Sequence, residues 1–201
     1  MNLEQAVAAR RSVREFEDRP VPRDAVLRAI SLAVQAPAPH HSSPWRFSLL
    51  EEPEAKDSFA RAMGAAWRAD LASDGVPREQ IDRILTRSHE LLTGAPLLTV
   101  CSADLSKAHA YPDERRRLAE WSLFAHSTGA ALQVYMLALA EAGIASCWIS
   151  APVFCRDVVR SELGLTGAVE PQALVLVGYP SAEYSPRPRA GVDPRDYVAG
   201  S

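Results

Sequence analysis

The segment from Leu118 to Leu139 constrains the fold most strongly. Apolar side chains recur there at alternating spacings of three and four residues, and further apolar side chains fill the faces between them. A helix that is apolar over so wide an arc is buried in a core or at a subunit interface. Gly143 follows the segment and is typical of a helix end. The sequence therefore predicts one long helix, around which the rest of the chain packs.

Shorter elements are predicted on both sides of this helix. Apolar periodicity indicates helices over residues 3–9, from 23 to the prolines at 37 and 39, over 54–71, from 77 to 91 and over 153–163. Apolar runs indicate strands over 47–50, 97–101, 146–150 and 173–177. Because helices and strands mix without regular alternation, we predict the α+β class and a single domain spanning residues 1–201.

The C-terminal tail, residues 180–201, is rich in proline and arginine and is predicted to be extended. Such a tail has little to pack on in its own subunit, so we expect an arm that reaches a partner subunit. Arg187 and Arg189 alternate within it and would point to the same side. A disordered basic tail is the alternative interpretation.

Composition and charge exclude several functions. With a net charge of -3 and 47% hydrophobic residues, the chain is an ordinary folded protein without a nucleic-acid footprint or a basic membrane patch. The three cysteines have no spacing typical of a disulfide framework. We find no apolar run of the roughly 18 residues that span a membrane and no signal-peptide pattern at the N-terminus. We therefore expect a cytoplasmic protein.

The segment Arg10–Arg14 is the first candidate site. In an extended chain Arg10, Ser12 and Arg14 face one way, and their donors suit a phosphate or the carbonyl edge of a flavin. If the arm returns toward Arg10, several guanidinium groups converge, which is costly unless an anion lies among them. A solvated basic stretch is the alternative.

Other patterns are less specific. The strand end at Trp148 leads into a turn of small residues, where backbone N–H groups can approach a planar ring, but the sequence alone favours an ordinary core strand and turn. His40 and His41 are adjacent, the other three histidines are scattered, and none has metal-binding spacing, so no metal site is expected. We find no nucleophile motif and assign no catalytic side chain, which suits chemistry that a cofactor carries.

Five segments, taken in order, resemble the FMN-dependent nitroreductase family: RRSVREF, APAPHHSSPWRF, the long apolar helix, CWIS and GYPS with the later RPR. The resemblance implies a mostly antiparallel sheet sandwiched by helices, in an intertwined homodimer with FMN at the subunit interface. The implied FMN-binding residues are Arg10, Arg11, Ser12, Arg14, Trp148, Ile149, Ser150, Arg187 and Arg189, with Ala38, Pro39 and His41 from the neighbouring subunit.

Several positions depart from the bacterial nitroreductases. His41 replaces an asparagine, Ser150-Ala151 replaces an acidic residue and glycine, and Ser88 and Leu91 replace an asparagine and a lysine. With WRADLASDG and HAYPD, these departures resemble the FMN- and F-420-binding domain of the coenzyme F-420 biosynthesis family, in which a gamma-glutamyl ligase domain comes first. The implied substrate-binding residues are Trp67, Arg68, Asp70, His109 and Tyr111.

Three functions are open at this point. The first is an FMN-dependent oxidoreductase that reduces dehydro-F-420-0 to F-420-0. The second is a generalist NAD(P)H-dependent nitroreductase or quinone reductase. The third is a non-catalytic module that binds a flavin or F-420 and partners a separate gamma-glutamyl ligase. The segment Trp67–Gly75 favours the first, because a generalist enzyme has no need for it.

Overall fold

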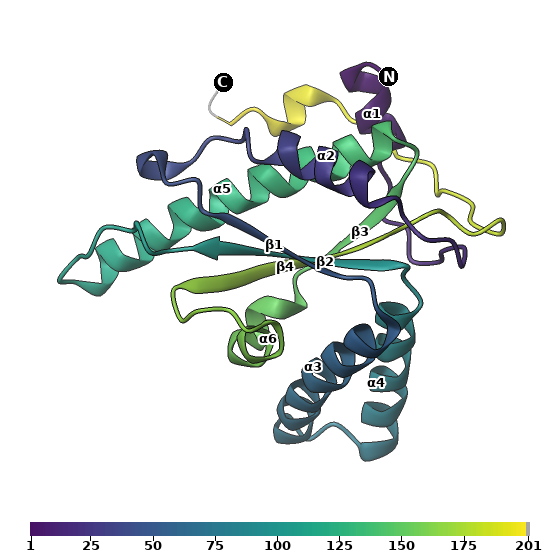
Figure 1. The fold of residues 1–201 in the computed structure, drawn as a ribbon, viewed down its shortest axis with the longest axis horizontal. Coiled ribbons are helices and arrows are strands. Elements are labelled where there is room, and N and C mark those ends of the chain that lie inside the picture. The colour runs from purple at the N-terminus through teal and green to yellow at the C-terminus, as the bar shows by residue number, and fades with distance from the viewer. Residues whose placement is uncertain (200–201) are drawn as a thin grey trace.

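The computed structural model describes residues 1–199, which fold around a four-stranded sheet (Figure 1). The strands lie in the order β1-β2-β4-β3, and every neighbouring pair is antiparallel. Their bounds are β1 Trp45–Leu50, β2 Leu97–Asp104, β3 Ala145–Ile149 and β4 Val169–Gly178. The α+β class and the antiparallel sheet are confirmed, and the homodimer stays a prediction.

Helices cover both faces of the sheet. α1, α2 and α5 lie on one side of it, and α3, α4 and α6 lie on the other (Figure 1). Their bounds are α1 Leu3–Ala9, α2 Arg23–Ala33, α3 Pro53–Ser73, α4 Arg78–Thr93, α5 Glu114–Glu141 and α6 Arg156–Leu163. Three short 3-10 turns complete the described chain: η1 Pro39–His41, η2 Ala151–Phe154 and η3 Pro194–Tyr197.

The two central strands are buried on both faces. In β4 the side chains of Val175 and Val177 join the core formed with α2 and α5, while those of Leu174 and Leu176 join the core formed with α3 and α6. Successive side chains of a strand point to opposite faces, so a continuous apolar run supplies both cores at once. The apolar runs of the sequence therefore become the middle of a three-layer fold.

Helix α5 is the long predicted helix. Asp113 caps its start by accepting a hydrogen bond from Arg116 N at 2.9 Å, and Gly143 follows its end with a φ of 73°. Leu118 and Leu123 stay 60% and 44% exposed, so this chain alone does not cover the whole apolar arc. By length and composition α5 could also span a membrane, although 44% of its most apolar 18-residue stretch is buried in the fold.

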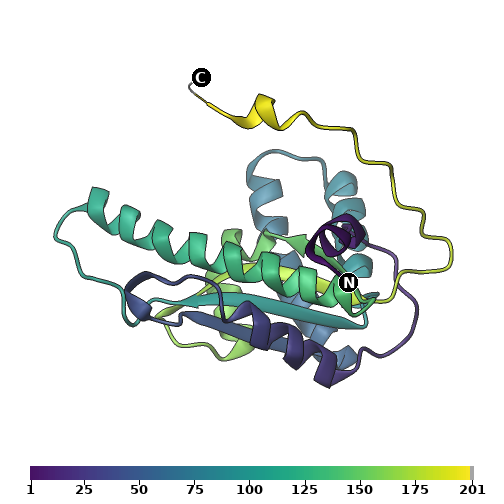
Figure 2. The same ribbon diagram turned by 90° about the horizontal axis from the view of Figure 1, so that it is seen from above.

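One predicted helix differs from the structure, and the tail has the predicted extended form. The helix expected over 153–163 is split, because Cys155 adopts a non-helical φ of -136° between η2 and α6. The tail leaves the body as an extended segment and passes above it, as Figure 2 shows. Its last part, with η3, leaves Val192 and Tyr197 69% and 76% exposed. An arm that packs on a second subunit remains a prediction.

Candidate functional site

Residues 12–16 run along the end of the sheet. Val13 N donates a hydrogen bond to Ser146 O at 3.1 Å, and Ser12 forms a parallel bridge with Ser146. Val13 is buried, whereas its neighbours Ser12 and Arg14 are exposed. This alternation is that of an extended chain, and it directs Arg14 away from the core.

The tail returns to this segment and brings arginines together. The Arg189 guanidinium donates to Val7 O at 3.0 Å and to Arg10 O at 2.6 Å. Loss of solvent, with the positive charges of Arg11 and Arg10, lowers the pKa of Arg189. Arg187 forms no hydrogen bond or ion pair within residues 1–199.

Arg11 shows what this cluster lacks. Its Nε and Nη1 atoms are buried and have no hydrogen-bond partner among the described residues. Buried N–H donors without an acceptor are costly, and positive neighbours add repulsion. An anion with several acceptor oxygens, such as a phosphate, would satisfy these donors. The cluster of Arg10, Arg11 and Arg189 is therefore a candidate phosphate site.

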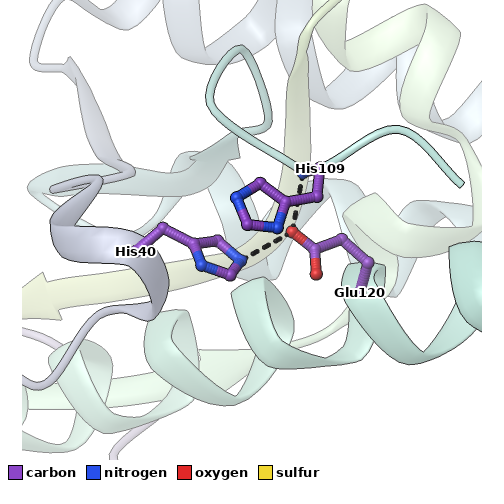
Figure 3. Close-up of side chains that lie close together, drawn as sticks. All are labelled: His40, His109 and Glu120. Atoms are coloured by element: carbon purple, nitrogen blue, oxygen red, sulfur yellow. Dashed lines mark hydrogen bonds and ion pairs between the residues drawn. The ribbon is translucent and has the colours of Figure 1, made fainter.

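The loop before β1 forms a second cluster. His40 Nε2 lies 2.8 Å from Glu120 Oε1, and His109 N donates to the same oxygen at 2.8 Å (Figure 3). The rings of His40 and His109 stack with centroids 3.9 Å apart. Sequence spacing gives no sign of this cluster, because its residues are far apart in the chain and meet over α5. Tyr111 lies beside His109, with ring centroids 6.4 Å apart.

A cavity of about 1040 Å³ lies between the hairpin of α3 and α4 and the end of β3. Arg14, Ile149 and Ser150 line it from the side of the sheet, and Trp67 and Asp70 line it from α3. The cavity is large enough for a ligand of cofactor or drug size. It joins residues predicted to bind cofactor with residues predicted to bind substrate.

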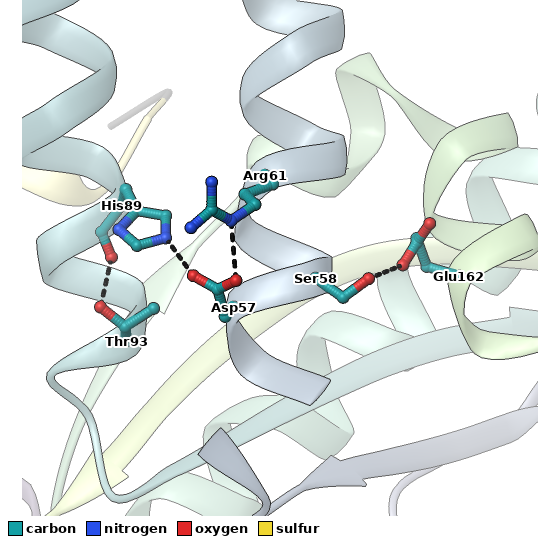
Figure 4. Close-up of polar contacts among 6 residues, drawn as sticks. All are labelled: Asp57, Ser58, Arg61, His89, Thr93 and Glu162. Atoms are coloured by element: carbon teal, nitrogen blue, oxygen red, sulfur yellow. Dashed lines mark hydrogen bonds and ion pairs between the residues drawn. The ribbon is translucent and has the colours of Figure 1, made fainter. Parts of the chain in front are cut away.

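Polar contacts at the base of the hairpin hold one wall of this cavity. Asp57 accepts hydrogen bonds from Arg61 and His89 at 2.7 and 2.8 Å, which ties α3 to α4 (Figure 4). The Arg61 and His89 donors lower the pKa of Asp57. Ser58 donates to Glu162 at 3.0 Å and so ties α3 to α6. These hydrogen bonds thus hold α3, which forms this wall, against α4 and α6.

Helix α4 contributes residues that sequence reasoning missed. Ile84, Arg87, Ser88 and Leu91 all line the cavity, at the spacing of one helix face. The apolar periodicity predicts the helix, but it does not show that this face lines a cavity. The exposed Phe154 of η2 also lines the cavity and carried no sequence signal, because an exposed apolar residue in a turn has no pattern.

Some predicted residues point elsewhere. Trp148 donates from Nε1 to Ser150 Oγ at 2.9 Å, and its ring lies against Gly129 of α5, where an added Cβ would be 3.8 Å away. Arg68 pairs with Asp82 at 2.7 Å and is not among the residues that line the cavity. Of the predicted residues Trp148, Ile149 and Ser150 at the end of β3, only Ile149 and Ser150 line the cavity.

Apart from the phosphate cluster, two groups of predicted site residues lie far from each other within one chain. Arg14, Ile149, Ser150, Trp67 and Asp70 share the cavity. The other group lies at the opposite end of the molecule, in the loop before β1 and the loop before α5 (Figure 1). Its members are Ala38, Pro39, His41, His109 and Tyr111. A single subunit does not bring the two groups together.

Comparisons with known proteins agree with this architecture. The model of the nitroreductase family matches residues 7–179. The iodotyrosine deiodinase of Drosophila melanogaster is 29% identical over 182 residues, which cover 89% of this chain and 62% of that protein. The chain thus spans about three fifths of the deiodinase.

Solved structures show the same fold. A BluB-like flavoprotein from Clostridium difficile 630 superposes with a TM-score of 0.79 at 20% identity, over 100% of this chain and 99% of that chain. The FMN and NADPH-dependent nitroreductase NfnB from Sphigopyxis sp. strain HMH has a TM-score of 0.70 at 26% identity, over 100% and 99% of the two chains.

Proposed function

The chain belongs to the nitroreductase family, and we propose that it is an FMN-dependent oxidoreductase that reduces dehydro-F-420-0 to F-420-0. The observation that carries this proposal is the composition of the cavity. Arg14, Ile149 and Ser150, assigned to the flavin by resemblance, line the same cavity as Trp67 and Asp70, which belong to the F-420-like segment. The substrate-side segment thus adjoins the flavin-side residues in one subunit.

The residues present fit FMN. The buried Nε and Nη1 atoms of Arg11 lack acceptors, and a phosphate monoester supplies them. Arg10, Arg11, Ser12 and Arg189 would hold the phosphate, while Arg14 and Ser150 would lie along the ring system. FMN, when bound, supplies hydride transfer, so the protein needs to supply position and electrostatics rather than a nucleophile.

The chain's own residues would select and orient the substrate. Trp67 is 43% exposed at the cavity and offers an aromatic face to a planar ring. Asp70 and Arg87 place opposite charges in the lining, and neither forms an ion pair within residues 1–199. Such groups favour a substrate that carries polar substituents on an aromatic body.

The proposal includes a second subunit. We infer a homodimer in which Ala38, Pro39 and His41 of one subunit contact the flavin held by the other, with the arm 180–201 across the interface. A cytoplasmic location and a separate gamma-glutamyl ligase partner belong to the same proposal. The exposed apolar residues of the arm and of α5 support an interface of this kind.

A generalist nitroreductase or quinone reductase is the second candidate. The dependence of the Sphigopyxis NfnB on FMN and NADPH favours it, because that protein matches this chain over its whole length at 26% identity. A mostly apolar cavity also accepts many flat aromatic compounds. Both candidates require bound FMN, and the compound that is reduced distinguishes them.

The decisive experiment compares oxidants under anaerobic conditions. The FMN-loaded protein is reduced and mixed with dehydro-F-420-0, with a nitroarene, with a quinone and with an iodotyrosine, while the flavin absorbance is followed. We expect fastest reoxidation by dehydro-F-420-0, with F-420-0 as product. Fast reoxidation by the nitroarene or quinone alone would establish the generalist instead.

The binding step is tested first. Protein mixed with FMN and passed over a desalting column should remain yellow. A colourless protein would overturn both enzymatic candidates. If that protein still binds F-420 in a fluorescence titration, the non-catalytic module would take their place.

A further inference from the structure

We propose that His40, His109 and Glu120 form a binding site for a divalent transition metal ion such as Zn²⁺. One ligand atom from each residue lies within 4.8 Å of the others. Two imidazoles and a carboxylate are a common ligand set for such ions. The site lies outside the cavity. It forms where the loops that carry His40 and His109 meet over Glu120 of α5.

The carboxylate is held in place before any ion binds. The Glu120 side chain is 5% exposed, and its Oε1 atom accepts from both His109 N and His40 Nε2 at 2.8 Å. Its Oε2 atom accepts no hydrogen bond within residues 1–199. A buried carboxylate is costly unless a positive group offsets its charge. A bound cation would offset that charge, while the His109 N–H keeps the carboxylate oriented.

The ligand distances need only a small change. His40 Nε2 and Glu120 Oε1 lie 2.8 Å apart, and a zinc ion binds nitrogen and carboxylate oxygen at about 2.0–2.2 Å. The ion would take the place of the hydrogen bond between these two atoms. The His109 ring must turn out of its stack on His40, where the rings meet at 23°. His109 is exposed and lies in a loop outside the helices, so the ring has room to turn.

An ion at this position would clamp the loop that carries the predicted flavin contacts. His40, His41 and Ser43 have positive φ values of 53°, 49° and 48°. Such conformations are unfavourable for these residue types and persist where surrounding contacts hold them. Coordination of His40 would fasten η1 to α5, and with it the neighbouring Pro39 and His41. The ion would thus have a positioning role.

The ligand types define the chemical class of the ion. Imidazole nitrogen favours zinc, nickel and cobalt, whereas magnesium and calcium prefer sets made of oxygen. Three protein ligands leave at least one position open to water in a tetrahedral site. We therefore expect binding of Zn²⁺ and Co²⁺ but not of Mg²⁺ or Ca²⁺.

The test uses the full chain and the metals alone. Calorimetric titration with Zn²⁺ and absorption spectra with Co²⁺ are recorded for wild type, His40→Ala, His109→Ala and Glu120→Gln. The control is His89→Ala, because His89 also pairs with a carboxylate, that of Asp57, but no second histidine joins them. Circular dichroism establishes that each variant is folded.

We expect one Zn²⁺ per wild-type chain, at least about a tenfold loss of affinity in each ligand variant and no change in the control. Unaltered Zn²⁺ affinity in folded His40→Ala and His109→Ala would overturn the proposal. Absence of Zn²⁺ binding to wild type would overturn it as well. A Co²⁺ spectrum with thiolate charge-transfer bands would assign the ion to cysteine and reject this ligand set.

Discussion

In the Arg11 guanidinium, the Nε and Nη1 atoms are buried and lack a partner within residues 1–199. The sequence predicted an anion site over Arg10–Arg14, but it placed the outward-facing Arg10, Ser12 and Arg14 at its centre. In an extended segment Arg11 shares the inward side with Val13, which is 2% exposed. The missing acceptor at Arg11 is therefore a stronger sign of a phosphate than the exposed side chains are.

Arg11→Ala and Arg189→Ala should each weaken FMN binding. A charge-assisted hydrogen bond contributes about 1.5–3 kcal/mol, so each variant should bind FMN roughly ten to a hundred times more weakly. Quenching of flavin fluorescence on binding measures the dissociation constant. Arg195→Ala is the matched control, because Arg195 lies in the same tail and pairs with Asp193. Equal FMN affinity in all three variants would reject the phosphate site.

Asp104 should make stability depend on pH. Burial raises its pKa, but hydrogen bonds from Ser106 and the charge of Arg46 outweigh burial, so the pKa lies below its usual value. Its stabilising effect is therefore complete above the unfolded value of about 3.9 and is lost as pH falls through the folded value. Asp104→Asn should cost about 1 kcal/mol at pH 7, since Arg46 is partly exposed, and less below pH 3.

Urea unfolding at both pH values measures this difference. Asp82→Asn serves as the control, because the Arg68–Asp82 pair is about half exposed on both sides and should contribute less than about 0.5 kcal/mol. A cost of Asp104→Asn that stays constant from pH 7 to pH 3 would show that its charge does not stabilise the fold.

At the scale of elements, the end of β4 is packed against two other segments. An added Cβ at Gly178 would lie 2.7 Å from both Phe16 Cδ1 and Pro96 Cδ. Gly178→Ala should therefore lower the free energy of unfolding by about 1–3 kcal/mol, through overpacking. Gly64→Ala is the matched substitution, since Gly64 lies inside α3 with no atom within 4 Å of such a Cβ.

Gly64→Ala should instead stabilise the protein by about 0.5–1 kcal/mol, because alanine favours the helix. Thermal unfolding separates the two variants, with shifts of roughly 2–4 °C per kcal/mol for a chain of this size. If Gly178→Ala unfolds at the wild-type temperature, the close approach of Phe16 and Pro96 does not hold in solution.

The elements themselves were largely predictable, because local periodicity and burial determine them. Apolar runs predicted the four strands of the sheet within a few residues. The alternating three- and four-residue spacing of apolar side chains predicted α5. The cavity was less accessible to such reasoning. The face of α4 with Ile84 and Leu91 has the same apolar periodicity whether it covers a core or lines a cavity. Only the packing of α3 against α4 shows that this face lines a cavity and does not cover a core.

At the scale of the whole molecule, the site residues that line the cavity lie far from those in the loops near the start of α5. Sequence order could not predict this separation, nor the meeting of His40, His109 and Glu120, because both depend on how distant loops pack. The resemblance did assign Ala38, Pro39 and His41 to a neighbouring subunit. The division of the predicted site within one chain is what such an assignment requires.

A site shared between subunits should be recoverable by mixing defective chains. One variant carries Arg11→Ala and Arg189→Ala, and the other carries a Pro39→Gly and His41→Ala loop. Each homodimer has two defective sites. In the mixed dimer, the intact phosphate cluster of one subunit meets the intact loop of the other, and the second site carries both defects. Tandem affinity purification of co-expressed chains should yield mixed dimers that bind about one FMN each. The wild-type dimer should bind about two.

The stoichiometry separates this arrangement from a site built within one chain. If each subunit held FMN by itself, the loop variant would bind FMN as a homodimer, and mixing would add nothing. Recovery of FMN only in the mixed dimer therefore requires residues from two chains at one flavin. Sedimentation of the purified mixture confirms that the species measured is a dimer. A monomeric wild-type chain that binds FMN fully would refute the shared site.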